Sequence, residues 1–312
     1  LSKVMHTFGT THGREQQSLQ KNKNILITGH RGFVGRHFWK RLENDHYLTG
    51  VDIVDGLDAR QFFKANDTHF DLVIHLAAVV GGRATIEGAP LSVAVDLAID
   101  AEMWQWALRT RPGRVVYYSS SAAYPVSLQA RECHWRLEEQ MINLDDIQSP
   151  DLTYGWAKLT GEYQAKFVQA EGVKVNVFRP FSGYGEDQSL DYPFPSFIER
   201  GVNRANPFEI WGDGKQTRDF IHIDDVVEGT LAAADQDYPE PLNLGTGRAT
   251  SFNDLAHLVT RACNYYPEIS HLPAKPTGVD WRVANIDNMY NVYKPKVTLE
   301  EGIQRSIDWR TK

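Results

Sequence analysis

Tyr154 and Lys158 are the two residues whose types and spacing most directly indicate chemistry. They stand four positions apart, so in a helix their side chains share one face. An ammonium group beside a phenol stabilises the phenolate, and moving a phenol pKa from about 10 towards 7 takes about 4 kcal/mol of such stabilisation. The pair therefore indicates a tyrosine that acts as a general base near neutral pH. The same spacing is also common on exposed helix faces, so the context has to decide.

A second group, Gly29, Gly32 and Gly35, separates the apolar run 25–27 from a helical pattern. Glycines at such a turn let the backbone approach a pyrophosphate, and the N–H groups of the helix N-terminus face its charge. The next apolar run ends near Asp52, where a carboxylate can accept hydrogen bonds from the ribose hydroxyls of adenosine. This carboxylate would repel a 2′-phosphate, and no arginine follows it closely. The pattern predicts NAD rather than NADP.

Two further polar features stand near these motifs, and the first of them allows two interpretations. Asp58 either approaches the adenine or is a solvated loop acid. Three serines, Ser119, Ser120 and Ser121, directly follow the apolar run 114–118, so they are predicted at the end of a strand near the tyrosine–lysine helix.

The elements that must position these residues form a repeating pattern. Short apolar runs alternate with longer helical patterns, which indicates a doubly wound parallel sheet covered on both faces, an α/β fold of the Rossmann type. The expected strands are 25–27, 47–53, 72–76, 114–118 and 173–178, and the expected helices are 32–43, 91–109 and 154–170.

The sequence pattern changes after Arg179, where prolines cluster, glycines become frequent and strand patterns become sparse. We therefore expect a flexible N-terminal tail over 1–23, a dinucleotide-binding domain over 24–179 and a smaller substrate-binding domain over 180–312. Some segments of the last are expected to pack back on the first.

Composition excludes several classes of protein. The 312 residues contain 33 Lys and Arg against 40 Asp and Glu, a net charge of −7, and no basic run, which disfavours a nucleic-acid partner. No apolar stretch approaches the roughly 20 residues that span a bilayer. Residues 1–23 lack the apolar core of a secretory signal. The two cysteines show no pairing or metal-binding pattern, so a cytoplasmic protein without a metal is expected.

Taken together, these motifs resemble the extended short-chain dehydrogenases/reductases, specifically the NAD-dependent nucleotide-sugar epimerase/dehydratase family. The resemblance covers nearly everything from 24 to 309, and its motifs stand in the family's order: Thr28-Gly29-x-x-Gly32-Phe33-x-Gly35, His75-Leu76-Ala77-Ala78, Ser119-Ser120-Ser121-x-x-Tyr124, Tyr154-x-x-x-Lys158, Arg179-Pro180-Phe181 and Gly212-Asp213-Gly214-x-x-x-Arg218-Asp219-Phe220-x-His222-x-x-Asp225.

The resemblance implies a role for each matching residue. Tyr154 would be the catalytic base, Lys158 would hold the nicotinamide ribose, and Ser120 would bond the reacting sugar hydroxyl. Ser119 and Ser121 are the alternatives to Ser120 in that role. If Ser120 holds it, Ser119 is expected to contact the cofactor and Ser121 the substrate. The remaining residues implied to contact NAD are Gly29, Gly32, Phe33, Val34, Leu76, Ala77, Ala78 and Phe181.

On the substrate side, the resemblance implies a nucleotide-diphosphate sugar whose phosphates are held by Arg218 and Arg282. Both arginines also fit ordinary surface ion pairs. Ser182 stands where the family commonly has a phosphate-binding asparagine, and a serine reaches less far. The resemblance further suggests a homodimer through the helices 91–109 and 154–170, paired by apolar stripes. These stripes consist of Val95, Ala98, Met103 and Trp106 on the first helix, and Leu159 and Phe167 on the second.

The departures from the family pattern bear on the reaction. Ser121 and Ala122 replace the Asp-Glu pair of the dehydratases, and Ala122 also replaces the catalytic cysteine of 3,5-epimerases and fucose synthases. Tyr192 falls where fucose synthases have a histidine. We therefore expect a 4-epimerase that works through a transient 4-keto sugar, although Phe208–Gly214 resembles the GDP-sugar branch. The alternatives are an NAD(P)-linked oxidoreductase or 3,5-epimerase-like enzyme on a GDP-sugar, and a non-catalytic dinucleotide sensor.

Overall fold

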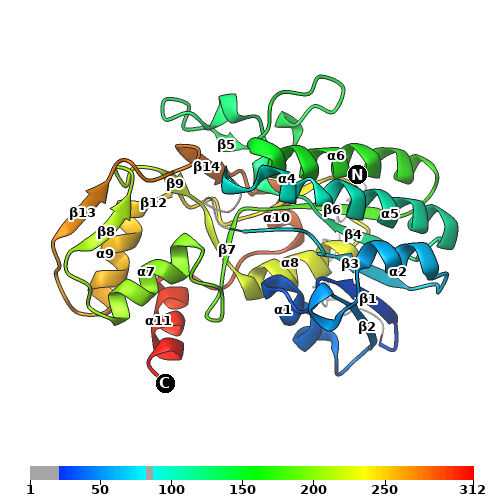
Figure 1. The fold of residues 1–312 in the computed structure, drawn as a ribbon, viewed down its shortest axis with the longest axis horizontal. Coiled ribbons are helices and arrows are strands. Elements are labelled where there is room, and N and C mark those ends of the chain that lie inside the picture. Colours follow the sequence, from blue (N-terminus) through cyan, green and yellow to red (C-terminus); the bar gives the residue numbers. More distant parts are fainter. Residues whose placement is uncertain (1–20, 82–86) are drawn as a thin grey trace, which may run out of the picture.

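A six-stranded parallel sheet forms the centre of the computed structural model, which describes residues 21–81 and 87–312 (Figure 1). The strands stand in the order β11-β6-β4-β3-β1-β2, and every neighbouring pair is parallel. Their bounds are β1 Asn24–Thr28, β2 Tyr47–Val51, β3 Leu72–His75, β4 Val115–Tyr118, β6 Val175–Pro180 and β11 Leu242–Leu244. The predicted Rossmann-type fold is confirmed.

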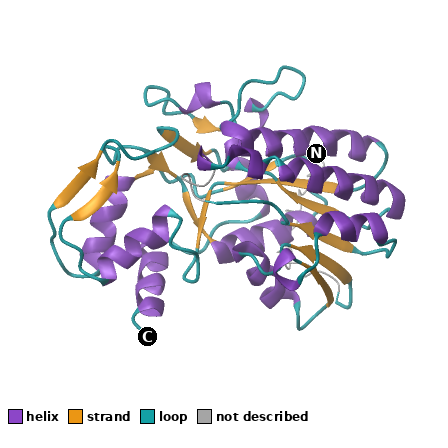
Figure 2. Cartoon of the chain, in the orientation of Figure 1, coloured by secondary structure: helices purple, strands orange, loops and turns teal. Residues whose placement is uncertain are grey.

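Helices cover both faces of this sheet (Figure 2). One face packs against α1 (Phe33–Leu42), α8 (Ile223–Asp235) and α10 (Asp287–Val292), and the other against α2 (Ala59–Ala65), α5 (Val95–Thr110) and α6 (Leu152–Ala170). Because strand side chains alternate, Ile25 and Ile27 join the first core while Leu26 joins the second. Both faces are buried, which explains the continuous apolar runs in the sequence.

The C-terminal region has a core of its own, built on the helices α7 (Pro193–Val202), α9 (Phe252–Ala262) and α11 (Leu299–Arg310). Sequence patterns indicated few strands here, but the structure contains a series of short ones. They are β7 Ser182–Tyr184, β8 Phe208–Trp211, β9 Thr217–Arg218, β10 Phe220–His222, β12 Thr250–Ser251, β13 Ile269–Leu272 and β14 Trp281–Ala284. The last of these pairs with β5 (Arg136–Leu137), a short strand from the earlier part of the chain. Strands of two to four residues are too short to show a periodic pattern.

The expected helix 91–109 is divided into α4 (Pro90–Val93) and α5, which meet at Ala94. Three of the six apolar side chains expected at the dimer contact are also buried within the chain. Met103 and Trp106 are fully buried and Leu159 is 2% exposed, so they pack inside one chain, and only Phe167 of the second stripe is well exposed. Within the described ranges, no helix is both long and apolar enough to cross a membrane.

Candidate active site

A cavity of about 1000 Å³ opens where the carboxyl ends of the sheet strands meet the C-terminal region. Crevices at this edge are the usual ligand sites of open α/β sheets. Every residue predicted to contact the cofactor or the substrate lines it: Gly29, Gly32, Phe33, Val34, Asp52, Asp58, Leu76, Ala77, Ala78, Ser119, Ser120, Ser121, Tyr154, Lys158, Phe181, Ser182, Arg218 and Arg282. The fold therefore brings together residues that lie more than 250 positions apart in the chain, from Gly29 to Arg282.

The glycine turn forms one end of the cavity and requires glycine for steric reasons. Gly29 has a φ of 73°, and a Cβ there would lie 2.9 Å from the Ala77 nitrogen. A Cβ on Gly35 would lie 2.2 Å from the Gly29 oxygen. No side chain caps the N-terminus of α1 at Gly32, so its first N–H groups are available to an anion. This cradle fits the pyrophosphate of a dinucleotide.

Asp52 is held rigidly beside that turn. It is 9% exposed, and its two carboxylate oxygens accept the N–H groups of Arg31 at 2.9 Å and Val54 at 3.0 Å. The Arg31 guanidinium does not contact Asp52 but pairs with Asp55, with Nη2 and Oδ1 2.9 Å apart. The sequence search considered only arginines that follow Asp52, and so overlooked this one from the preceding turn.

Asp58 serves a structural purpose at the start of α2. Its Oδ1 accepts the Arg60 N–H at 2.8 Å, and its Oδ2 lies 2.6 Å from Arg60 Nη2. The Arg60 hydrogen bond holds the pKa of Asp58 below its usual value. The carboxylate still lines the cavity, so contact with an adenine remains a prediction.

Tyr154 and Lys158 lie on α6 and face the serine turn. Ser120 begins a short turn in which its Oγ accepts the Ala122 N–H at 3.0 Å. The Ser120 side chain is also close enough to Tyr154 to act on the pKa of its hydroxyl. The Lys158 side chain is buried, with Nζ 5.8 Å from the centre of the Tyr154 ring. The tyrosine, the lysine and the serine are thus assembled in one place.

The electrostatics of this group differ from the sequence expectation. Burial raises the pKa of Tyr154 above its ordinary value, against the opposing effects of the Lys158 charge and the Ser120 hydrogen bond. The pKa of Tyr154 is therefore higher than its ordinary value, and not lower as the sequence led us to expect. Burial lowers the pKa of Lys158, but Tyr154, Asp100 and Asp96 outweigh it and raise that pKa, so the ammonium stays charged.

Two buried carboxylates beside Lys158 escaped the sequence analysis. Asp100 accepts a hydrogen bond from Tyr117 at 2.5 Å and lies 3.1 Å from His75 Nε2. Asp96 accepts the Val79 N–H at 2.6 Å, while its other oxygen is buried with no hydrogen-bond partner among the described residues. Burial raises the pKa of Asp96 to about 6. In the sequence, the sign of this pair is two aspartates four positions apart within an apolar helical pattern.

Ser119 is engaged away from the cavity. Its hydroxyl donates to Glu162, which forms a buried ion pair with Arg179 in which Oε2 and Nη2 are 2.6 Å apart. Arg179 also donates to the Glu139 carbonyl at 2.7 Å. This network fixes the turn that carries Ser120, and a cofactor contact by the Ser119 hydroxyl remains a prediction.

The two predicted phosphate arginines have different surroundings. Arg218 donates to the carbonyls of Thr217 at 2.8 Å and Thr277 at 3.0 Å. Arg282 forms an ion pair with Asp151, and its Nε donates to Gln129 at 2.6 Å. Arg282 is therefore not an exposed surface arginine, since its guanidinium ties β14 to the start of α6.

Phe181 and Ser182 close the cavity at the end of β6. Phe181 is 6% exposed and packs in a small core with Tyr124. Ser182 begins β7, and its N–H donates to the Asp219 carbonyl at 2.9 Å.

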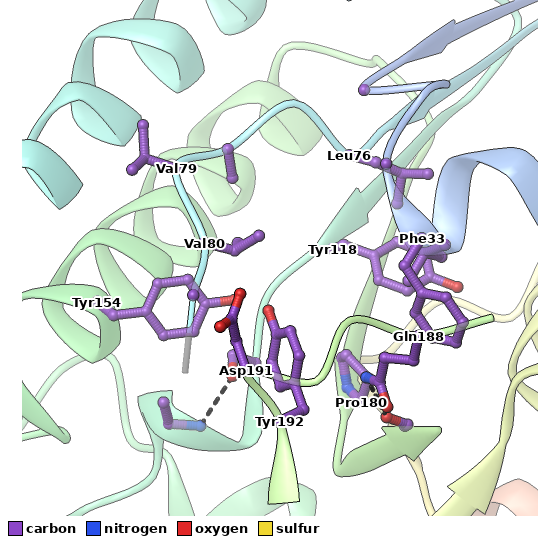
Figure 3. A pocket seen from close by; sticks show the side chains of 18 of the residues that line it. Phe33, Leu76, Val79, Val80, Tyr118, Tyr154, Pro180, Gln188, Asp191 and Tyr192 are labelled. Carbon is purple, nitrogen blue, oxygen red and sulfur yellow. Dashed lines mark hydrogen bonds between the residues drawn. The ribbon is translucent and has the colours of Figure 1, made fainter. Parts of the chain in front are cut away.

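The opposite wall supplies Tyr192, which the comparison with fucose synthases had singled out, and two groups that sequence reasoning missed, Asp191 and Arg200. Asp191 and Tyr192 precede α7, and their side chains point toward the hydroxyl end of Tyr154 (Figure 3). Asp191 Oδ2 accepts the Ser189 hydroxyl at 2.9 Å. Burial, together with the charges of Tyr154 and Asp191, raises the pKa of Tyr192 to about 12. Farther along, Arg200 lines the cavity with Nη1 buried and without a hydrogen-bond partner among the described residues.

This fold and cavity define a class of protein, and comparison with known families gives the class a name. The chain belongs to the NAD dependent epimerase/dehydratase family, whose model matches residues 25–245. The glycine cradle and Asp52 fit the cofactor of that family, so NAD is the cofactor of this chain.

Individual relatives extend the likeness over nearly the whole chain. GDP-mannose 3,5-epimerase of Arabidopsis thaliana is 28% identical, over 97% of this chain and 88% of the relative. GDP-L-fucose synthase 1 of the same plant is 25% identical, over 97% of this chain and 98% of the relative.

Solved structures are similar to this chain over nearly its whole length as well. MoeE5, solved in complex with UDP-glucose and NAD, has a TM-score of 0.77 at 27% identity, over 92% of this chain and 98% of its own. A UDP-glucose 4-epimerase from Thermotoga maritima has a TM-score of 0.79 over 92% of this chain and 98% of its own, and its 24% identity supports the fold alone.

Proposed function

We propose that this protein is a nucleotide-sugar 4-epimerase that works through a transient 4-keto sugar. The observation that carries the proposal is the grouping of Tyr154, Ser120 and Lys158 in the cavity wall. Ser121 and Ala122, which follow Ser120, offer no acid to expel a sugar hydroxyl, which argues against a dehydratase.

In this mechanism Ser120 and Tyr154 hold the C4 hydroxyl of the sugar. NAD, held by the glycine turn and Asp52, would supply reversible hydride transfer at C4. Tyr154 removes the hydroxyl proton, and the Lys158 ammonium stabilises the phenolate during that transfer. When the hydride returns to the other face of C4, Tyr154 gives the proton back to the oxygen. Ser120 keeps the oxygen in place through both steps.

Three arginines fit the nucleotide part of the substrate. Arg218 and Arg282 fit the diphosphate, because a guanidinium fork matches phosphate oxygens, although Arg282 must then share its hydrogen bonds with Asp151. Arg200 fits an acceptor on the nucleoside, since its buried nitrogen lacks a partner in the described structure. UDP-glucose in the MoeE5 complex and the GDP-sugar named for the plant epimerase are the first candidates for the substrate.

A 3,5-epimerase acting on a GDP-sugar is the second candidate. It is favoured by the 28% identity to GDP-mannose 3,5-epimerase over 97% of the chain. The position of its family cysteine is Ala122 here, so any carbon acid or base would have to come from elsewhere in the cavity.

We further propose a homodimer built on the outer surfaces of α4, α5 and α6. Helices α5 and α6 lie side by side (Figure 1). The three elements expose large apolar side chains that a second copy would cover: Leu91, Leu97, Leu152, Trp156, Tyr163 and Phe167.

The test is incubation of the NAD-loaded protein with UDP-glucose, UDP-N-acetylglucosamine and GDP-mannose, followed by proton NMR. A sugar inverted at C4, with no net change in cofactor, supports the proposal. If none of these sugars is converted although NAD is bound, the proposal fails and a non-catalytic dinucleotide sensor is favoured.

A further inference from the structure

We propose that Asp191 makes the sugar end of the cavity selective for an uncharged hexose. Its carboxylate would accept a hydrogen bond from the C6 hydroxyl of such a sugar and repel the C6 carboxylate of a uronic acid. This inference rests on the proposed function and narrows it to one class of sugar.

Asp191 lies on the wall of the cavity that faces Tyr154. It precedes Tyr192, the N-cap residue of α7, at the end of the segment that joins β7 to that helix. In Figure 3 the Asp191 carboxylate and the Tyr192 hydroxyl point toward the hydroxyl end of Tyr154. Burial raises the pKa of Tyr192, and the charges of Tyr154 and Asp191 raise it further, as expected for three side chains that share this space. A sugar whose C4 oxygen contacts Tyr154 would therefore lie against Asp191.

The Asp191 carboxylate is available to a ligand. Its Oδ2 accepts the Ser189 hydroxyl at 2.9 Å, and among the described residues its Oδ1 has no hydrogen-bond partner. The residue is exposed and lines the cavity. A sugar hydroxyl that reaches Oδ1 would form a charge-assisted hydrogen bond, which is shorter and stronger than one between neutral groups.

The cations of the cavity are engaged away from Asp191. In the described parts of the chain, the lining includes six basic side chains and no histidine: Arg31, Arg60, Lys158, Arg200, Arg218 and Arg282. Arg31 and Arg60 pair with acids near the glycine turn, and Arg282 pairs with the acid at the start of α6. The Arg200 guanidinium lies over two aromatic rings of the C-terminal region. Among the described residues, no Lys, Arg or His forms an ion pair with Asp191.

Lys158 is the cation beside Tyr154, but carboxylates balance its charge. Burial lowers the pKa of Lys158, whereas Tyr154, Asp100 and Asp96 raise it. The ammonium is thus already compensated by two acids behind the cavity wall, and Asp191 adds a further negative charge in front. A carboxylate on the sugar would find no uncompensated cation at this end of the described cavity.

The place of C6 on a hexose determines what this charge selects. C6 is bonded to C5, the neighbour of C4, so it stays beside C4 whichever face of the ring meets the cofactor. It carries a hydroxyl in a neutral hexose and a carboxylate in a uronic acid. Two like charges about 5 Å apart at an effective dielectric constant of about 20 repel enough to weaken binding by about 10²-fold. Solvent at the open wall screens part of this effect, so we expect at least about 10-fold.

The experiment compares UDP-glucose with UDP-glucuronate, which differ only at C6, on the NAD-loaded full chain. Proton NMR gives kcat/KM for each sugar, and calorimetric titration gives each Kd. We expect wild type to favour UDP-glucose in both measures by at least about 10-fold. If the protein converts only GDP-mannose, the pair of GDP-mannose and GDP-mannuronate replaces this one.

Asp191→Asn removes the charge and keeps the shape of the side chain, so it should lower the preference by about 10-fold. Asp191→Lys should reverse the preference. A merely structural defect would lower both rates together and leave their ratio unchanged. Asp308→Asn, an exposed acid on α11 outside the cavity, is the matched control and should keep the wild-type ratio.

The two proposals fail in different ways. Inversion at C4 of both sugars with equal efficiency, or a preference that persists in Asp191→Asn, would overturn the inference and leave the 4-epimerase intact. If no sugar is converted but the Kd preference is present in wild type and lost in Asp191→Asn, the proposed function fails and the selective role of Asp191 in binding stands. If no sugar binds, both proposals are wrong.

Discussion

The guanidinium of Arg282 and the carboxylate of Asp151 form an ion pair at 2.8 Å with little exposure, 13% and 8% of the two side chains. Arg282 lies on β14 in the C-terminal region, and Asp151 is the N-cap residue of α6, three positions before Tyr154. The proposed phosphate-binding arginine is thus attached to the helix that carries the proposed base. A diphosphate that binds Arg282 would compete with Asp151 for the guanidinium, and so it would also affect the start of α6.

Arg282→Gln should destabilise the protein because it removes the positive charge that pairs with the nearly buried Asp151 carboxylate. Loss of one member of a buried pair costs about 3 kcal/mol or more, whereas replacing both members is far milder. We therefore expect urea unfolding to show a large loss in the single variant and partial recovery in Arg282→Gln with Asp151→Asn. Equal stabilities of the single and double variants would contradict the coupling. The KM for the sugar nucleotide should rise in the single variant and in the double variant, because both lack the Arg282 guanidinium.

Asp96 should make stability depend on pH. Its pKa is about 6 in the folded protein and near 3.8 in an unfolded chain, because burial disfavours the charged form. The folded state therefore holds the proton more tightly, so ionisation of Asp96 opposes folding. The cost is absent below about pH 4, grows between 4 and 6 and is complete above 6.

Asp96→Asn removes that ionisable group and keeps the shape of the side chain. Its free energy of unfolding relative to wild type should increase from pH 4 to pH 8, by about 2 to 3 kcal/mol at most. Urea titrations at a series of pH values measure this difference, with Asp308→Asn as an exposed control. A difference that stays constant across this range would show that Asp96 does not titrate between 4 and 6.

The sequence predicted the sheet well because its strands are buried on both faces and read as continuous apolar runs, such as 25–27 and 114–118. The residues of the cavity floor were equally predictable from the sequence, since Gly29 and Ser120 follow predicted strands and Tyr154 lies on a predicted helix. The family model, which matches 25–245, confirms the class inferred from those motifs.

The rest depended on tertiary contacts that no local pattern contains. The apolar residues Met103 and Trp106 gave no sign of which neighbour would bury them, and the structure places them in the core beneath the sheet. The pairing of Arg282 with Asp151 joins positions 131 apart, and the loop carrying Asp191 has no periodicity. The direction of the Tyr154 pKa depended on burial, which residue types alone do not determine.

Asp52→Ala should weaken NAD binding by about 10- to 100-fold, since hydrogen bonds to a charged group contribute about 1.5 to 3 kcal/mol. Tryptophan fluorescence titration of cofactor-free protein measures the change. Asp58→Ala is the companion variant, because it separates the two interpretations of that residue. A comparable loss would place Asp58 at the adenine, and an unchanged Kd with a less stable α2 would leave it as a helix cap. If Asp52→Ala binds NAD as tightly as wild type, the ribose assignment is wrong.

Phe167→Glu should disrupt the proposed dimer. The ring is 55% exposed on α6, and a charge there would be costly to bury against a second copy. Sedimentation should give wild type twice the 35.4 kDa mass of one chain and the variant a single chain. Trp309→Glu changes a similarly exposed aromatic residue on α11 and should leave the wild-type mass unaltered. A wild-type protein that sediments as a single chain would exclude the interface.

Tyr154→Phe should lower turnover by at least about 10², because it removes the hydroxyl that is proposed to take the sugar proton. The aromatic ring stays, so the packing around Lys158 and the affinity for NAD should change little. Lys158→Met should also slow the reaction, for a different reason. Without the ammonium charge the pKa of Tyr154 rises further, so its residual activity should increase with pH more steeply than that of wild type. Rates of sugar conversion measured between pH 6 and 10 would show this, and a Tyr154→Phe rate near that of wild type would remove the tyrosine from its role as base.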